Sequence, residues 1–226
     1  MKYAGMPMGM WALYKKSFRD HLVSVLGFSK AEAARIAVDA KPKYREIIQK
    51  LPEFEKEDRF KMNIVNCALF SAFLLCMKEK PTVEKLTDFY AKAMMNVPTR
   101  WFCRMSGKSK FSEKDEAEMK RTAALNAADR NPYSWNMDFL PYADGSGYEA
   151  RFTKCGICTL MKEFGLSEFI PAMCRLDYTM AEAGGACDFV REYTLAGGGP
   201  YCDCGYKKKK IILKILVVSR LLKVVN

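Results

Sequence analysis

Residues 60–77, the most apolar segment of the chain, constrain its fold more than any other feature. Their apolar side chains recur mostly at steps of three and four residues, which places them on one face of an α-helix. Lys61, Asn63, Asn66 and Ser71 interrupt the run, whereas a membrane span needs about 20 predominantly apolar residues. We therefore expect a helix buried in the protein core.

The rest of the first 130 residues also has the pattern of helices. Ser29 and Glu32 have the spacing of a capping box, in which each side chain satisfies a free backbone N–H group of the first turn. The helix that they begin is expected to end at Pro42, because proline lacks the N–H group that a helix interior needs. A further helix over residues 83–96 is expected to stop before Pro98.

The pattern changes after residue 131 to short elements separated by glycine and proline. Alternation of apolar and polar residues predicts strands over residues 148–153, 188–195 and 201–206, and helices are expected over 155–164 and 177–183. The sequence therefore predicts an α+β fold. A helical half, residues 1–130, packs as one compact unit with a mixed α/β half, residues 131–206, that contains a small antiparallel sheet.

The net charge is concentrated at the C-terminal end. The chain carries a formal charge of +11, but seven basic residues and no acid follow residue 206, and subtracting these seven leaves +4. That value is ordinary for a protein surface, so we expect no nucleic-acid partner. Residues 207–226, four lysines followed by mostly aliphatic residues, are expected to lie outside the core fold. Membrane contact by this tail, as a basic amphipathic helix, is the less favoured alternative.

Histidine is almost absent, and cysteine is abundant. The single histidine, His21, excludes His-rich metal sites and disfavours a catalytic triad, which needs a histidine base. No secretory signal precedes the nine cysteines. We therefore expect a cytoplasmic protein whose thiols are free, catalytic or metal-bound rather than paired in disulfides.

Most of the cysteines are gathered near the end of the chain. Six of the nine lie in the last quarter, at Cys155, Cys158, Cys174, Cys187, Cys202 and Cys204. The CxxC and CxC pairs among them are able to bind zinc or part of an iron–sulfur cluster, but the intervening spacing does not fit a standard zinc ribbon. Thiol redox chemistry is a second alternative, although the βαβ context typical of a redox CxxC is missing. We assign no metal site and no cofactor.

With one histidine, acid–base chemistry must rest on Asp, Glu, Cys or Tyr. A carboxyl group in an apolar pocket has a raised pKa and can transfer protons near neutral pH. Asp177 and Asp203 are the favoured candidates, because each lies within three residues of a cysteine. Cys174 and Asp177 would share one face of a helix. For Asp177 the alternative is a helix N-cap, while Asp203 falls in an expected strand, where aspartate is disfavoured.

This region resembles the C-terminal signature of the L-2-amino-thiazoline-4-carboxylic acid hydrolase family. The family pattern runs Thr-x-Cys, Gly-Leu, Cys-x-x-Asp, Arg-x-x-Thr and Cys-Asp-Phe. In this chain its parts correspond, in the same order, to Thr153 and Cys155, Gly165 and Leu166, Cys174 and Asp177, Arg191 and Thr194, and Cys202 and Asp203. The chain departs from the pattern at Cys204, where the family has phenylalanine, and it continues past the usual end of the pattern after Tyr206.

The resemblance implies a hydrolase of sulfur amino acid metabolism. In the family's reaction, water adds to the ring carbon between nitrogen and sulfur of a cyclic isothiourea, and the C–S bond breaks to give N-carbamoyl-L-cysteine. Such a reaction needs a base, an acid and a cation for the substrate carboxylate.

The resemblance also assigns roles to residues of this chain. One of the two aspartates would be base or acid, and the thiols would be nucleophile, proton donor or metal ligands. A guanidinium would bind the substrate carboxylate through two hydrogen bonds. The residues expected to be catalytic are Cys174, Asp177, Cys202 and Asp203, and those expected to bind substrate are Arg191 and Thr194.

A second class of function stays open from the residues alone. A helical layer over a small sheet with a cysteine-lined pocket also suits a non-catalytic domain that senses a small molecule or a metal, because fold does not determine function. Such a domain would retain its ligand without converting it.

Overall fold

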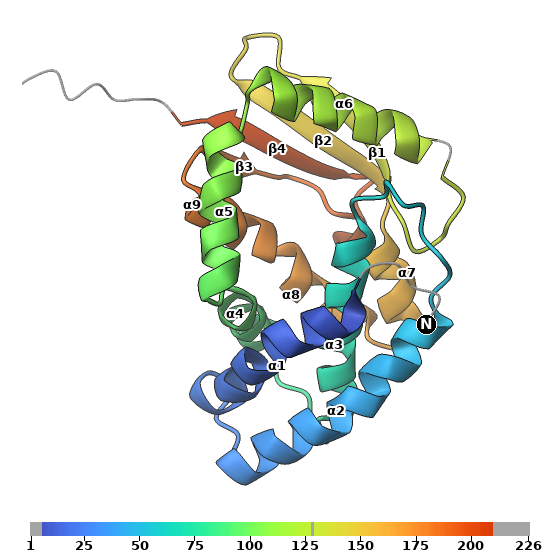
Figure 1. Ribbon diagram of the computed structural model, residues 1–226, viewed down its shortest axis with the longest axis vertical. Helices are drawn as coiled ribbons and strands as arrows, with labels where there is room; N and C mark the ends of the chain where they lie inside the picture. The colour runs from blue at the N-terminus through green and yellow to red at the C-terminus, as the bar shows by residue number, and fades with distance from the viewer. Residues whose placement is uncertain (1–5, 128, 210–226) are drawn as a thin grey trace, which may run out of the picture.

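The computed structural model describes residues 6–127 and 129–209. The first part of the chain is helical (Figure 1), with α1 (Pro7–Ser24), α2 (Lys30–Lys50), α3 (Lys61–Cys76), α4 (Val83–Met94), α5 (Val97–Ser109) and α6 (Glu113–Ala127). The second part begins with strands β1 (Asn136–Pro141) and β2 (Gly147–Lys154) and continues with helices α7 (Gly156–Glu163), α8 (Ile170–Cys174) and α9 (Leu176–Gly184). It ends with β3 (Cys187–Val190) and β4 (Cys202–Lys208). The expected α+β class is confirmed.

The core is built around α3, as its apolar sequence predicts. Every residue of α3 from Cys67 to Leu74 is fully buried, and α2 lies against it along its length. Phe73 of α3 packs between two aromatic rings of α1, with its ring centroid 5.8 Å from that of Trp11 and 5.0 Å from that of Phe18. In the described part of the chain, no helix combines the length and the apolarity needed to cross a membrane.

The four described strands form one antiparallel sheet in the order β1-β2-β4-β3. Tyr148 pairs with Tyr206 and Ala150 with Cys204, so side chains of β2 and β4 alternate between two faces. One face, called here the inner face, is buried against the helices. Its buried side chains are Met137, Tyr148, Ala150, Cys187, Phe189, Cys202 and Cys204. The opposite face carries more exposed and polar residues.

Of the two helix ends expected at prolines, one is confirmed, because α4 ends at Met94, before Pro98. The expectation that a helix ends at Pro42 is wrong, because α2 continues through Pro42 to Lys50. Val38, whose carbonyl loses its helical partner at Pro42, is 70% exposed and therefore open to water. The burial of Tyr44 and Ile47 beyond the proline stabilises the continued helix. Pro98 lies in the first turn of α5, a helix that the sequence analysis did not predict, where the missing N–H costs little.

The strands near the end of the chain also differ from expectation. The strand expected over residues 188–195 ends at Val190, and a short 3-10 turn, η2 (Leu195–Gly197), follows it. Strand β1 was not expected at all. Strand β4 continues to Lys208, two residues into the segment expected outside the fold. Residues 210–226 of that segment lie outside the described residues.

Several helices of the first part contact the second part: α3 packs against α7, α4 against α8 and α9, α5 against α9, and α6 against β1. In the α5–α9 contact the two backbones touch directly. A Cβ atom built on Gly107 of α5 would lie 2.2 Å from the carbonyl oxygen of Gly184 in α9. These two glycines therefore let α5 and α9 pack closely against each other (Figure 1).

Replacing a glycine inside a helix by alanine usually stabilises a protein, but the close contact of α5 with α9 predicts the opposite effect at Gly107. Gly107→Ala should lower the free energy of unfolding by about 1–3 kcal/mol, because the added methyl group forces the two helices apart. Gly9→Ala in α1 is the matched control, since its Cβ would lie 3.7 Å from the nearest atom. That control should raise the free energy of unfolding by up to about 1 kcal/mol through helix propensity. Urea denaturation measures both values, and equal stabilisation by the two variants would contradict the packing.

Candidate active site

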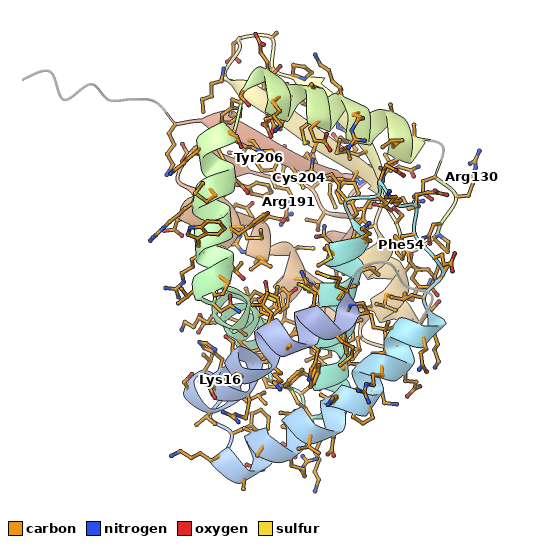
Figure 2. The ribbon with its side chains drawn as sticks, viewed as in Figure 1. Lys16, Phe54, Arg130, Arg191, Cys204 and Tyr206 are labelled. Carbon is orange, nitrogen blue, oxygen red and sulfur yellow. The ribbon has the colours of Figure 1, made fainter. Side chains whose placement is uncertain are left out.

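A buried arginine joins three elements of the second part. Arg191 follows β3, and only 6% of its side chain is exposed. Its Nη1 donates to Oδ2 of Asp177 in α9 at 2.8 Å, and its Nη2 donates to the backbone carbonyl of Cys174 in α8 at 2.6 Å. Cys204 of β4 lies 3.9 Å from Nη1 at its sulfur. Figure 2 shows Arg191, Cys204 and Tyr206 together on the side of the sheet that faces the helices.

Aromatic rings hold the guanidinium group from the sides. Its central carbon lies 5.5 Å from the ring centroid of Tyr178 and 5.3 Å from that of Phe189. Rings at this distance attract a cation through their π faces. Arg191 is thus engaged by protein groups on several sides.

Asp177 differs from its partner in that it reaches solvent. It lies in the first turn of α9, and 44% of its side chain is exposed because it lines a pocket. Protein atoms surround the pocket on its other sides, and this burial raises the pKa of the Asp177 carboxyl above its usual range. The charge and the hydrogen bond of Arg191 oppose the rise. The pairing with Arg191, rather than an N-cap, is the contact that the Asp177 side chain makes.

The pocket lies between α5 and α9 and reaches the inner face of the sheet. Its volume is about 180 Å³. Besides Asp177 it is lined by Phe102, Cys103, Lys110, Met180, Cys187 and Tyr206, among others. This size suits a small metabolite rather than a drug-sized ligand, which needs about 300–1,000 Å³.

The thiols of the second part gather beside the arginine. All nine cysteines are free. Cys174 and Cys202 interact electrostatically with each other, with Cys155 and with the Asp177–Arg191 pair. Burial raises the pKa of Cys174 to about 12 and also raises that of Cys202, whose sulfur accepts the backbone N–H of Leu195 at 3.2 Å. Both groups are therefore neutral thiols near pH 7.

Cys155 is the exception among these thiols. It is the N-cap residue of α7, and although its sulfur makes no capping hydrogen bond, the Cys158 thiol, the backbone N–H groups of Cys158 and Ile157 and the indole of Trp135 all favour its ionised form. These donors lower the pKa of the Cys155 thiol despite its burial. The proton is retained on Cys158, whose pKa is raised by the hydrogen bond to Cys155.

Two of the expected site residues lie apart from this group. Asp203 sits between Cys202 and Cys204 in β4, so its side chain projects from the opposite face of the sheet. There its two carboxylate oxygens accept the backbone N–H groups of Glu192 and Tyr193 at 2.9 and 2.6 Å, which anchors the segment after Arg191. Thr194 caps the η2 turn, where its hydroxyl accepts the N–H of Gly197 at 3.0 Å. The structure thus brings together Cys174, Asp177, Cys202 and Arg191.

The described residues contain no group of three His, Cys, Asp or Glu side chains arranged to hold a metal ion. The CxxC and CxC pairs belong instead to the inner face of the sheet and to the start of α7. Sequence reasoning missed two residues of this region. Lys110 belongs to no motif. Cys155 is the first residue of the helix predicted over residues 155–164, and the N-terminus of a helix is a recognisable signal for a lowered thiol pKa.

The lowered pKa of Cys155 predicts selective alkylation. At about pH 7, below the ordinary thiol pKa of about 8.5, iodoacetamide should label Cys155 well before the other cysteines. Cys76 is the internal control, because it is also half-buried but its pKa is raised. Peptide mass spectrometry after short exposure measures both rates, and Cys155→Ser should remove the fast label. Labelling of Cys76 at the same rate would contradict the assignment.

The comparisons with known proteins identify one family. The model of the L-2-amino-thiazoline-4-carboxylic acid hydrolase family matches residues 62–206, well over half of the chain. No curated protein and no solved structure matches this chain. The matched range begins in α3 and ends in β4, so it includes the pocket, the Asp177–Arg191 pair and the surrounding thiols. The chain belongs to the L-2-amino-thiazoline-4-carboxylic acid hydrolase family.

Proposed function

We propose that this protein is a hydrolase that opens the ring of L-2-amino-thiazoline-4-carboxylate or a closely similar cyclic isothiourea. The observation that carries the proposal is the contrast within the Asp177–Arg191 pair: the arginine is buried, while the carboxylate is open to a pocket of metabolite size. A carboxylate held in this way can accept a proton from water at a fixed position. Membership of the family supports the choice of substrate.

The proposed reaction uses Asp177 twice. Its carboxylate takes a proton from water as the oxygen bonds to the ring carbon between nitrogen and sulfur. The substrate is bound as a cation whose ring nitrogen already carries a proton. The C–S bond then breaks, the departing sulfur takes the first proton of the water from the Asp177 carboxyl, and the new hydroxyl releases the second proton to solvent as it becomes the carbonyl of the product. The product is N-carbamoyl-L-cysteine, and one water is consumed. A raised carboxyl pKa suits both steps, because it makes the group a stronger base and keeps a usable acid near neutral pH.

The cysteines have a different place in this proposal. A departing alkyl thiolate has an ordinary pKa of about 8.5. The Cys174 thiol, with its pKa of about 12, is therefore a poorer acid than the group it would protonate. Cys174 and Cys202 are instead assigned to the neutral wall beside Arg191, where they keep water away from the guanidinium group. A reducing compartment such as the cytoplasm would keep these thiols free.

The first test is turnover. Asp177→Asn should lower kcat for release of the new thiol from L-2-amino-thiazoline-4-carboxylate by about 10²–10⁴-fold, because the amide cannot accept the proton of water. Asp188→Asn is the matched control, since Asp188 is exposed on β3 and lies outside the pocket. Ellman's reagent follows the thiol. Unchanged kcat in Asp177→Asn would remove the assignment, and stoichiometric ligand binding by the wild type without turnover would favour a sensor domain.

The pH profile tests the role of Arg191. The rate should rise with pH through the pKa of Asp177, because the base must be ionised, and this limb should lie above the ordinary aspartate value of about 3.9. Arg191 opposes the rise of that pKa, so Arg191→Met should move the limb to higher pH. Arg191→Lys keeps the charge and should move it less. A limb in the same place for all three proteins would show that the arginine has only a structural role.

A further inference from the structure

Lys110 carries a charge in the pocket that the proposed reaction leaves unused. It is the C-cap residue of α5, and its side chain lines the pocket together with Asp177. Its Nζ lies 3.7 Å from the ring centroid of Tyr206 and 4.7 Å from that of Tyr148, with Phe111 at 5.9 Å. Three aromatic rings therefore hold the ammonium group in place.

The walls of this aromatic cage are themselves fixed. One carboxylate oxygen of Asp115 accepts both the hydroxyl of Tyr148 at 2.7 Å and the backbone N–H of Phe111 at 2.9 Å. Phe111 has a φ of 64°, in the left-handed region that a phenylalanine rarely adopts. The Asp115 contact therefore holds a strained residue that places its ring beside Lys110.

The ammonium group lacks an anionic partner of its own. Lys110 takes part in none of the ion pairs between the residues that the structure describes. Burial lowers the pKa of Lys110, while Asp115, at a distance, partly compensates. A cation that is desolvated by aromatic rings and has no ion-pair partner is stabilised when an anion binds beside it.

Both charges of the pocket interact with the same aromatic residue, Tyr206. Lys110 stands over the face of Tyr206, and the Tyr206 hydroxyl interacts electrostatically with Asp177. Both charged groups line the same cavity of about 180 Å³. A small molecule with a carboxylate at one end and a cationic group at the other can therefore meet both at once.

We propose that Lys110 is the carboxylate-binding residue of this pocket, and that the pocket recognises a small zwitterion whose carboxylate meets Lys110 and whose amidine-type cation meets Asp177. This proposal rests on the proposed function for the identity of the cation, and it replaces Arg191 by Lys110 as the group that binds the carboxylate. Arg191 is engaged by Asp177 and the Cys174 carbonyl, whereas Lys110 has its ammonium group available.

The test compares two ligands that differ only in the carboxylate: L-2-amino-thiazoline-4-carboxylate and 2-amino-2-thiazoline. Isothermal titration calorimetry measures binding of each to the full-length Asp177→Asn protein, in which turnover is suppressed, and to the same protein with Lys110→Met or Lys110→Arg added. Lys110→Met should weaken binding of the carboxylate by about 10- to 100-fold, the value of a hydrogen bond to a charged group. It should change binding of 2-amino-2-thiazoline by less than about threefold, and Lys110→Arg should recover part of the loss.

The control variant is Lys108→Met, at an exposed lysine of the same helix outside the pocket. Equal weakening of both ligands by Lys110→Met would overturn the proposal, because it would show a structural role for the lysine. Failure of the Asp177→Asn protein with Lys110 intact to prefer the carboxylate over 2-amino-2-thiazoline would overturn it as well. Carboxylate-dependent binding without turnover by the wild type would support the role of Lys110 and contradict only the proposed hydrolysis.

Discussion

The buried guanidinium of Arg191 is the interaction on which the second half of this protein depends. An unpaired charge at 6% exposure would be costly, so Arg191 requires the groups that surround it. Those groups come from different elements: the Cys174 carbonyl ends α8, Asp177 begins α9, and Phe189 lies in β3. Satisfying one side chain therefore positions the α8–α9 corner against the edge of the sheet. The same contact holds the Asp177 carboxylate at the wall of the pocket.

The pocket also needs the helical half of the chain. Helix α5 supplies one wall and Lys110, and it reaches α9 only because Gly107 and Gly184 leave room for contact between the two backbones. We propose on this basis that the two halves act as one unit. The buried core points the same way, because α3 and α4 pack against α7 and α8 as well as against the N-terminal helices.

Sequence patterns predicted those helices and strands whose structure is determined by a few neighbouring residues. The apolar run of α3, the alternation of β2 and the glycine after α7 each encode their structure within a few neighbouring residues. The pairing of Cys174 with Asp177 was expected from their spacing on one helix, which is wrong because α8 ends at Cys174 and Asp177 lies in α9. Arg191 was added by family resemblance, because no spacing rule brings together residues 14 or more positions apart. The different position of Asp203 was available from alternation: if Cys202 and Cys204 face the core, the residue between them faces away. The place of Lys110 in the pocket and the continuation of α2 through Pro42 depend on tertiary contacts, which cannot be predicted from a short segment of sequence.

The most direct measurement of the central claim is a crystal structure of the full-length Asp177→Asn variant with L-2-amino-thiazoline-4-carboxylate. The account predicts the ligand between α5 and α9, with its ring carbon facing residue 177, and Arg191 still bound to the Cys174 carbonyl without touching the ligand. A ligand bound directly to Arg191, or one seated elsewhere on the protein while this pocket holds only solvent, would contradict it.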